Sequence, residues 1–179
     1  MKSINRHVAQ SESAGHRCIV HRGRFVVGPA ASELNEGLAN LERLIADLNG
    51  RDRTMNEAET RFHIIDRIIV ECLGWPAHPD ELHLEKAQGR EYSDYELGKP
   101  VTVIWEAKRE GKLFEVPKRR TASLVHALSS VMLVFTECKE AIDQVNGYCL
   151  ARGVEVAVAT NGHQIVVFRA EKDLDVKTK

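Results

Sequence analysis

The chain has 179 residues, of which 43% are hydrophobic and 28% charged, and its formal net charge is −1 at pH 7. These values are typical of one globular domain with room for an appended N-terminal piece, and they exclude a protein that binds nucleic acid through overall basic charge, so any DNA contact needs a local patch. No apolar run approaches the ~20 residues of a membrane span and no secretory h-region follows the N-terminus, so we expect no membrane partner and a cytoplasmic location with reduced cysteines.

Residues 1–54 form a predicted N-terminal extension with a frayed start, a short hairpin at 18–27 and a helix over 33–48. Ser32 is a suitable N-cap for that helix, and Asn49-Gly50 are residues that end helices. One face of the helix is apolar. It carries Leu34, Leu38, Leu41, Leu44, Ile45 and Leu48.

A second helix is predicted from about 56 to 73. Asn56 is its expected N-cap and Glu59, three residues on, completes a capping box. Glu57 and Arg61 are four residues apart, so we expect them to pair on one helix face. The apolar stripe of this helix contains Phe62, Ile65, Ile69 and Cys72, widened by Ile64 and Ile68.

A strand near 82–86 precedes two further strands that carry the most informative charges. We expect Asp94 to end one strand, a turn at Lys99-Pro100, and a second strand that ends in Glu106-x-Lys108. Residues two apart in a strand share a face, so Glu106 and Lys108 project together and the hairpin brings Asp94 beside them. Two carboxylates can hold Mg²⁺, and a lysine beside the cation can orient water or stabilise phosphate charge.

The C-terminal part continues with a basic stretch over 109–120 and an apolar segment over 121–138. A helix is predicted over 139–152, where Gln144 and Tyr148 share a face because they are four residues apart. Strands over 154–159 and 164–169 flank an Asn-Gly hairpin turn, and a charged tail covers 171–179. This order of elements indicates an α/β fold with a mixed sheet.

Taken together, residues 55–170 resemble the N-terminal nuclease domain of type I restriction enzyme R subunits, a branch of the PD-(D/E)xK nuclease superfamily. The matching residues are Glu57, Thr60, Arg61, Ile65, Asp66, Gly74, Trp75, Asp94, Tyr95, Leu97, Glu106, Ala107, Lys108, Gln144, Tyr148, Thr160, Asn161 and Gly162. The resemblance implies a restriction-endonuclease-like αβββαβ core with a mixed central sheet flanked by helices. The chain departs from the family in a longer, more apolar stretch over 112–140 and in the absence of a Walker A motif, so it is either an excised nuclease domain or a stand-alone nuclease.

The resemblance also implies roles for the charged residues in Mg²⁺-dependent hydrolysis of DNA, with Mn²⁺ as an alternative cation. Asp94 and Glu106 would bind the metal, the Ala107 carbonyl would be a third ligand, and Glu57 would reach the metal or its water. Lys108 would position the attacking water. Glu110, just past the strand, takes no part in this chemistry.

Substrate contacts are expected from two groups of side chains. Gln144 and Tyr148 would hold the DNA strand near the site. The local phosphate contacts would be basic side chains after the Glu-x-Lys strand, which otherwise form a solvated loop. These are Arg109, Lys112, Lys118, Arg119 and Arg120.

Three other functions stay open at this point. The fold could serve as a non-catalytic DNA-binding or assembly module, or the nuclease could act on RNA, because the metal chemistry is the same and no RNA-specific module is present. The chain could also be a restriction or phage-defence effector domain that acts within a larger complex or as a homo-oligomer.

Overall fold

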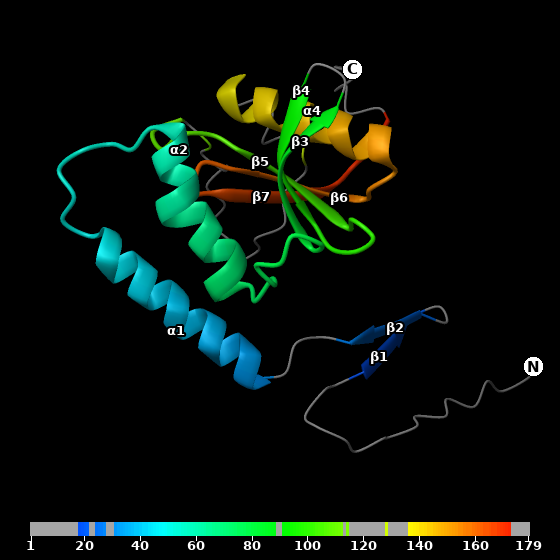
Figure 1. Ribbon diagram of the computed structural model, residues 1–179, viewed down its shortest axis with the longest axis horizontal. Coiled ribbons are helices and arrows are strands. Elements are labelled where there is room, and N and C mark those ends of the chain that lie inside the picture. The colour runs from blue at the N-terminus through cyan, green and yellow to red at the C-terminus, as the bar shows by residue number, and fades with distance from the viewer. Residues whose placement is uncertain are drawn as a thin grey trace, which may run out of the picture.

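The structure is a computed structural model that describes residues 18–21, 24–27, 31–88, 91–112, 114, 128 and 136–172. The elements expected at 1–17, most of the apolar segment over 121–138, the basic side chains of 118–120 and the last residues of the tail lie outside this described part. Figure 1 shows how the described helices and strands follow one another along the chain.

The predicted N-terminal hairpin is confirmed as a two-stranded antiparallel sheet. It pairs β1 (Cys18–His21) with β2 (Arg24–Val27).

The next element, α1 (Ala31–Leu48), exposes half of the six apolar residues predicted for one of its faces. It begins at Ala31, so Ser32 lies inside the first turn and the expectation that it caps the helix is wrong. Leu44 is buried at 1% exposure, whereas Leu34 and Leu38 are 60% and 56% exposed. The helix ends before Gly50, whose φ of 81° is the left-handed conformation expected of a C-terminal glycine.

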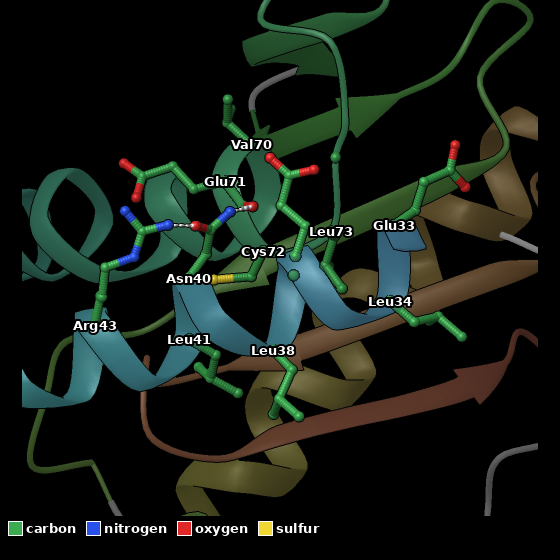
Figure 2. A pocket seen from close by; sticks show the side chains of 13 residues that line it. Glu33, Leu34, Leu38, Asn40, Leu41, Arg43, Val70, Glu71, Cys72 and Leu73 are labelled. Carbon is green, nitrogen blue, oxygen red and sulfur yellow. Dashed lines mark hydrogen bonds between the residues drawn. The ribbon is translucent and has the colours of Figure 1, made fainter. Parts of the chain in front are cut away.

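Besides Leu44, which joins the core beneath the second helix, two small residues of α1 lie against that helix. The Asn40 amide donates a hydrogen bond to the backbone carbonyl of Glu71, and Gly37 lies so close to the Cys72 carbonyl that a Cβ at that position would overlap it. A groove of about 930 Å³ lies between α1 and residues 70–74. Figure 2 shows its lining, with the Asn40 side chain bonded to the Glu71 backbone and to the Arg43 side chain.

The second helix begins with the predicted capping box. The Asn56 side chain accepts from the Glu59 N–H at 2.9 Å, and the Glu59 carboxylate accepts from the Asn56 N–H at 3.1 Å. The helix starts as α2 (Glu57–Thr60) and continues through two π-helical segments, η1 (Arg61–Ile65) and η2 (Ile68–Cys72).

These π turns change which side chains of the helix are buried. A π turn contains more residues than an α turn, so side chains spaced for an α-helix drift around the axis. Ile65 and Ile69 are fully buried as predicted, but Phe62 is 68% exposed and does not belong to the buried stripe.

A five-stranded mixed sheet forms the centre of the fold, and its strand order is β3-β4-β5-β6-β7. The pair β5–β6 is parallel and the other neighbours are antiparallel. The strands are β3 (Leu82–Gln88), β4 (Glu91–Leu97), β5 (Val103–Ala107), β6 (Val156–Thr160) and β7 (Ile165–Arg169). The α/β class with a mixed sheet is therefore confirmed.

Helices cover both faces of this sheet and create two cores (Figure 1). On one face, α4 (Thr136–Arg152) packs Ile142 and Val145 onto Ile104 and Ala157. On the other face, η1 and η2 pack their isoleucines onto strand side chains. That second core contains Leu44, Ile64, Ile65, Ile68, Ile69, Tyr95, Leu97, Trp105 and Val158.

The described residues bear on two expectations from the sequence, the lack of a membrane span and the reduced state of the cysteines. Within them, no helix is long and apolar enough to cross a bilayer. Cys72, Cys138 and Cys149 are free thiols there, as predicted.

Candidate active site

The strands β4 and β5 separate at Asp94. Their ladder stops at the pair Tyr95↔Trp105. Beyond that pair, Asp94 bonds to β5 through its side chain and not through its backbone. The Asp94 Oδ2 accepts a hydrogen bond from the Ala107 N–H at 2.7 Å. The expectation that Asp94 ends its strand is wrong, because β4 continues to Leu97; what ends beside Asp94 is the pairing with β5.

Asp94 and Glu106 point to the same face of the sheet. Tyr95 and Trp105 are paired and both belong to the core beneath the second helix. Neighbouring residues of a strand point to opposite faces, so Asp94 and Glu106 face α4. Glu106 is 2% exposed, which removes its carboxylate almost completely from water.

Lys108 connects the end of β5 to α4. Its Nζ donates to Glu106 Oε1 at 2.6 Å and to Gln144 Oε1 at 3.0 Å. The Gln144 Nε2 in turn donates to the Tyr148 hydroxyl at 2.8 Å. Four of the side chains selected from the sequence thus form one hydrogen-bonded chain, although they come from two elements.

Burial dominates the electrostatics of the two carboxylates. It raises the pKa of Glu106 to about 7, and the nearby charge of Asp94 adds to the effect. The pKa of Asp94 is raised as well, mainly by burial, although the Ala107 N–H and Arg61 oppose the shift. Burial opposes the charged form of Lys108, but the hydrogen bond to Glu106 and the negative charges of Glu106, Glu57 and Asp94 together outweigh it, so the pKa of the ammonium is raised.

Glu57 stands at the start of α2 and is exposed. Burial is the main cause of the raised pKa of Asp94 and of Glu106, and the negative charge of Glu57 adds a smaller contribution to both. Glu57 therefore belongs to the same cluster of charges. The expected pairing of Glu57 with Arg61 is wrong. The Arg61 guanidinium instead forms ion pairs with Asp94 at 3.2 Å and Glu85 at 3.0 Å.

The donor atoms present fit a divalent cation in part. Glu106 Oε2 is buried and has no hydrogen-bond partner, and Asp94 lies beside it. In a strand, the N–H and C=O of one residue point to the same edge, so the Ala107 carbonyl lies on the Asp94 side. Among the described residues, however, no group of three or more His, Cys, Asp or Glu side chains is arranged to hold a metal ion.

The basic side chains expected to contact phosphate have different surroundings. Lys112 is half-buried and its Nζ lies 2.8 Å from Glu137 Oε1, so an ion pair occupies it. Arg109 is exposed at the end of the strand that carries Glu106.

Two features next to the site are not apparent from sequence patterns. The Tyr95 hydroxyl donates to Asp66 at 2.7 Å and lies 3.4 Å from Arg61 Nε, which ties the second helix to β4. Glu110 is held by Arg51 at 3.0 Å and accepts from the Met55 N–H, so it fastens the loop after β5 to the segment before α2. Only the co-occurrence of Asp66 and Tyr95 in the family pattern hinted at the first feature.

Comparison of the chain with protein-family models, with curated proteins and with solved structures gives no match. The geometry of the site therefore carries the functional conclusion alone.

Proposed function

We propose that the chain is a Mg²⁺-dependent endonuclease that hydrolyses DNA phosphodiester bonds, and that its α2-to-β7 portion is a restriction-endonuclease-like αβββαβ core. The observation that carries this proposal is Glu106. Its carboxylate is buried, keeps one oxygen without a partner, and lies between Asp94 and the Lys108 ammonium. A buried carboxylate with unused acceptor capacity is costly for a protein unless a ligand uses it.

The raised pKa values of Asp94 and Glu106 support a cation at this position. Two desolvated carboxylates disfavour each other's charge, so a divalent cation would relieve the repulsion. Mg²⁺ favours carboxylate oxygens, and the proposed ligands are Asp94, Glu106 and the Ala107 carbonyl, with Glu57 reaching the ion or its water. When bound, the ion would lower the pKa of a coordinated water and offset charge on the phosphate.

Lys108 is the candidate for direct contact with the reacting groups. A lysine ammonium has three N–H donors, and Glu106 and Gln144 each receive one of them. The third can point to the attacking water or to a phosphate oxygen. In the hydrolysis, the water oxygen bonds to phosphorus, the bond from phosphorus to one bridging oxygen breaks, and that oxygen leaves with a proton as an alcohol.

The remaining predicted contacts surround this lysine. Gln144 and Tyr148 would hold the DNA strand while they fix the position of Lys108 from α4. Arg109 would contact a phosphate directly, whereas Lys112 would first have to leave Glu137. Such contacts give affinity that depends on salt but not on base sequence.

The biological setting belongs to the proposal too. A restriction or phage-defence effector in the cytoplasm, acting on DNA within a larger complex or as a homo-oligomer, fits a nuclease core without a motor.

One observation favours a second candidate, a non-catalytic DNA-binding or assembly module. Both acidic side chains already have a cationic neighbour, since Arg61 pairs with Asp94 and Lys108 with Glu106. A site neutralised in this way could be purely structural. Calorimetric titration of the chain with Mg²⁺ or Mn²⁺ separates the candidates, because the module would bind neither cation.

The nuclease itself is tested with supercoiled plasmid and Mg²⁺. We expect nicking by the wild type and a loss of at least about a hundredfold for Asp94→Ala and Lys108→Ala. Glu155→Gln is the control, because that glutamate is 73% exposed and pairs only loosely with Arg169 at 3.6 Å. Equal nicking by the wild type and both site variants would show that the assigned site is wrong.

A further inference from the structure

Arg61 lies between carboxylates that belong to two different strands. Its Nη1 is 3.2 Å from Asp94 Oδ1 on β4 and 3.0 Å from Glu85 Oε1 on β3. Its guanidinium also lies over the Tyr95 ring at 5.1 Å from the centroid. The same nitrogen is therefore shared by a partly buried acid of the candidate site and an acid whose side chain is 68% exposed.

The backbone at Glu85 is adapted to this contact. In the β3–β4 ladder Leu84 pairs with Tyr95 and Lys86 with Ser93, so the register runs on without a shift and places Glu85 directly opposite Asp94, where the ladder pairing is interrupted. Its φ is 52°, a conformation that residues other than glycine seldom adopt. From this position opposite Asp94, the Glu85 carboxylate reaches the same Arg61 nitrogen that Asp94 contacts.

Asp94 has no free oxygen in this arrangement. Arg61 engages Oδ1 and the Ala107 N–H engages Oδ2. A divalent cation at Asp94 would repel the guanidinium at close range, so the Arg61–Asp94 contact weakens as the cation enters. Glu85 is the one acid besides Asp94 that forms an ion pair with Arg61 in the described structure.

We propose that Arg61 exchanges with the cation: it neutralises Asp94 in the empty site and moves fully to Glu85 when Mg²⁺ or Mn²⁺ binds. Glu85 is then a positioning residue that sets the cation affinity without being a ligand. This inference rests on the proposed function, because it assumes that Asp94 binds a cation.

The test is a double-mutant cycle on the full chain, with the Mn²⁺ dissociation constant measured by calorimetry. Glu85→Gln should weaken Mn²⁺ binding about three- to fivefold, the factor that an ion pair of this exposure is worth. Arg61→Gln should tighten binding, and in that background Glu85→Gln should change the affinity less than about twofold. Glu155→Gln, in another exposed Arg–Glu pair, is the matched control and should have no effect.

The outcomes separate this inference from the function on which it rests. An equal loss from Glu85→Gln with and without Arg61 would mean that Glu85 acts through its charge or as a ligand, and the exchange would be wrong. If Asp94→Asn abolishes Mn²⁺ binding but Glu85→Gln leaves the Mn²⁺ affinity unchanged, the proposed exchange is wrong and the proposed metal site is retained. Failure of the wild type to bind Mn²⁺ would overturn both.

A second measurement covers the case in which Arg61→Gln does not fold, because Arg61 is largely buried. In a crystal structure of the wild type with Mn²⁺, the guanidinium should contact Glu85 and not Asp94. A retained Arg61–Asp94 ion pair beside the bound ion would overturn the exchange.

Discussion

Glu96 and Glu106 lie on neighbouring strands, face α4 and are each 2% exposed, yet their surroundings differ. Glu96 accepts from the Ser93 hydroxyl at 2.9 Å and pairs with Arg152 of α4 at 2.8 Å. Glu106 pairs with Lys108 through one oxygen and leaves the other without a partner. Burial alone therefore does not distinguish the two glutamates; the unpartnered oxygen of Glu106 does.

The difference also assigns two tasks to one face of the sheet. The Glu96–Arg152 ion pair joins β4 to α4, whereas the Glu106–Lys108 pair leaves one carboxylate oxygen for the cation that we propose. Substitutions at these glutamates should accordingly separate stability from activity.

The largest expected effect is the loss of activity in Glu106→Gln. Glutamine keeps the shape and can still accept from Lys108, but it removes the charge that we propose to bind the metal. We expect plasmid nicking in Mg²⁺ to fall at least about a thousandfold, equivalent to about 4 kcal/mol in the barrier. Glu96→Gln should keep the wild-type rate per folded molecule, and loss of nicking in that variant would erase the contrast between the two residues.

Glu96→Gln should instead lower the free energy of unfolding, by about 2–3 kcal/mol. Removal of one partner of a buried ion pair is costly, and the partial exposure of Arg152 reduces the effect. Urea unfolding measures the loss. A variant as stable as the wild type would mean that this pair does not hold α4 in place.

A third difference is the response of stability to pH without metal. The pKa of Glu106 in the folded protein is about 7, above its ordinary value of 4.5, so between these values the folded state binds more protons than the unfolded state. The contribution of Glu106 to stability should therefore decrease as pH rises through this window, by about 2 kcal/mol.

Urea unfolding of the wild type and Glu106→Gln at pH 5 and pH 7.5 in chelator isolates that contribution. The wild type should lose stability relative to the variant at the higher pH. A difference between the two proteins that stays constant with pH would contradict the raised pKa.

The smallest effect concerns a third glutamate, four residues after Glu106. Glu110 has a lowered pKa despite some desolvation, because Arg51 and the Met55 N–H bind its charged form. Glu110→Gln should reduce the free energy of unfolding by about 1 kcal/mol and leave nicking intact. A drop in nicking with unchanged stability would move Glu110 into the site.

Local patterns in the sequence predict the secondary structure well where the interactions are local. The capping box of Asn56 and Glu59 is an example, because both its hydrogen bonds lie within one turn. Phe62 is a counter-example, since π turns depend on how the helix meets the sheet and α-helical spacing does not reveal them. Ser32 was misplaced because a helix can begin one or two residues before a suitable cap.

The candidate site follows the same division. Strand periodicity predicts from the sequence that Asp94, Glu106 and Lys108 lie close together, and they do so in the structure. The positive φ of Glu85 and the ion pair between Arg61 and Asp94 depend on tertiary packing, and no pattern of residue types predicts them. The same holds for the protonation of Glu106, because its desolvation is set by the packing around it.

The parallel pairing of β5 with β6 determines at which stage of folding the candidate site is assembled. Lys108 and Gln144 are 36 residues apart, and α4 must form and cross the sheet before β6 can align beside β5. Contacts between distant segments form late and slowly in folding. A chain still emerging from the ribosome would therefore carry the acidic residues but not the assembled site, because Gln144 reaches Lys108 only once α4 has folded onto the sheet.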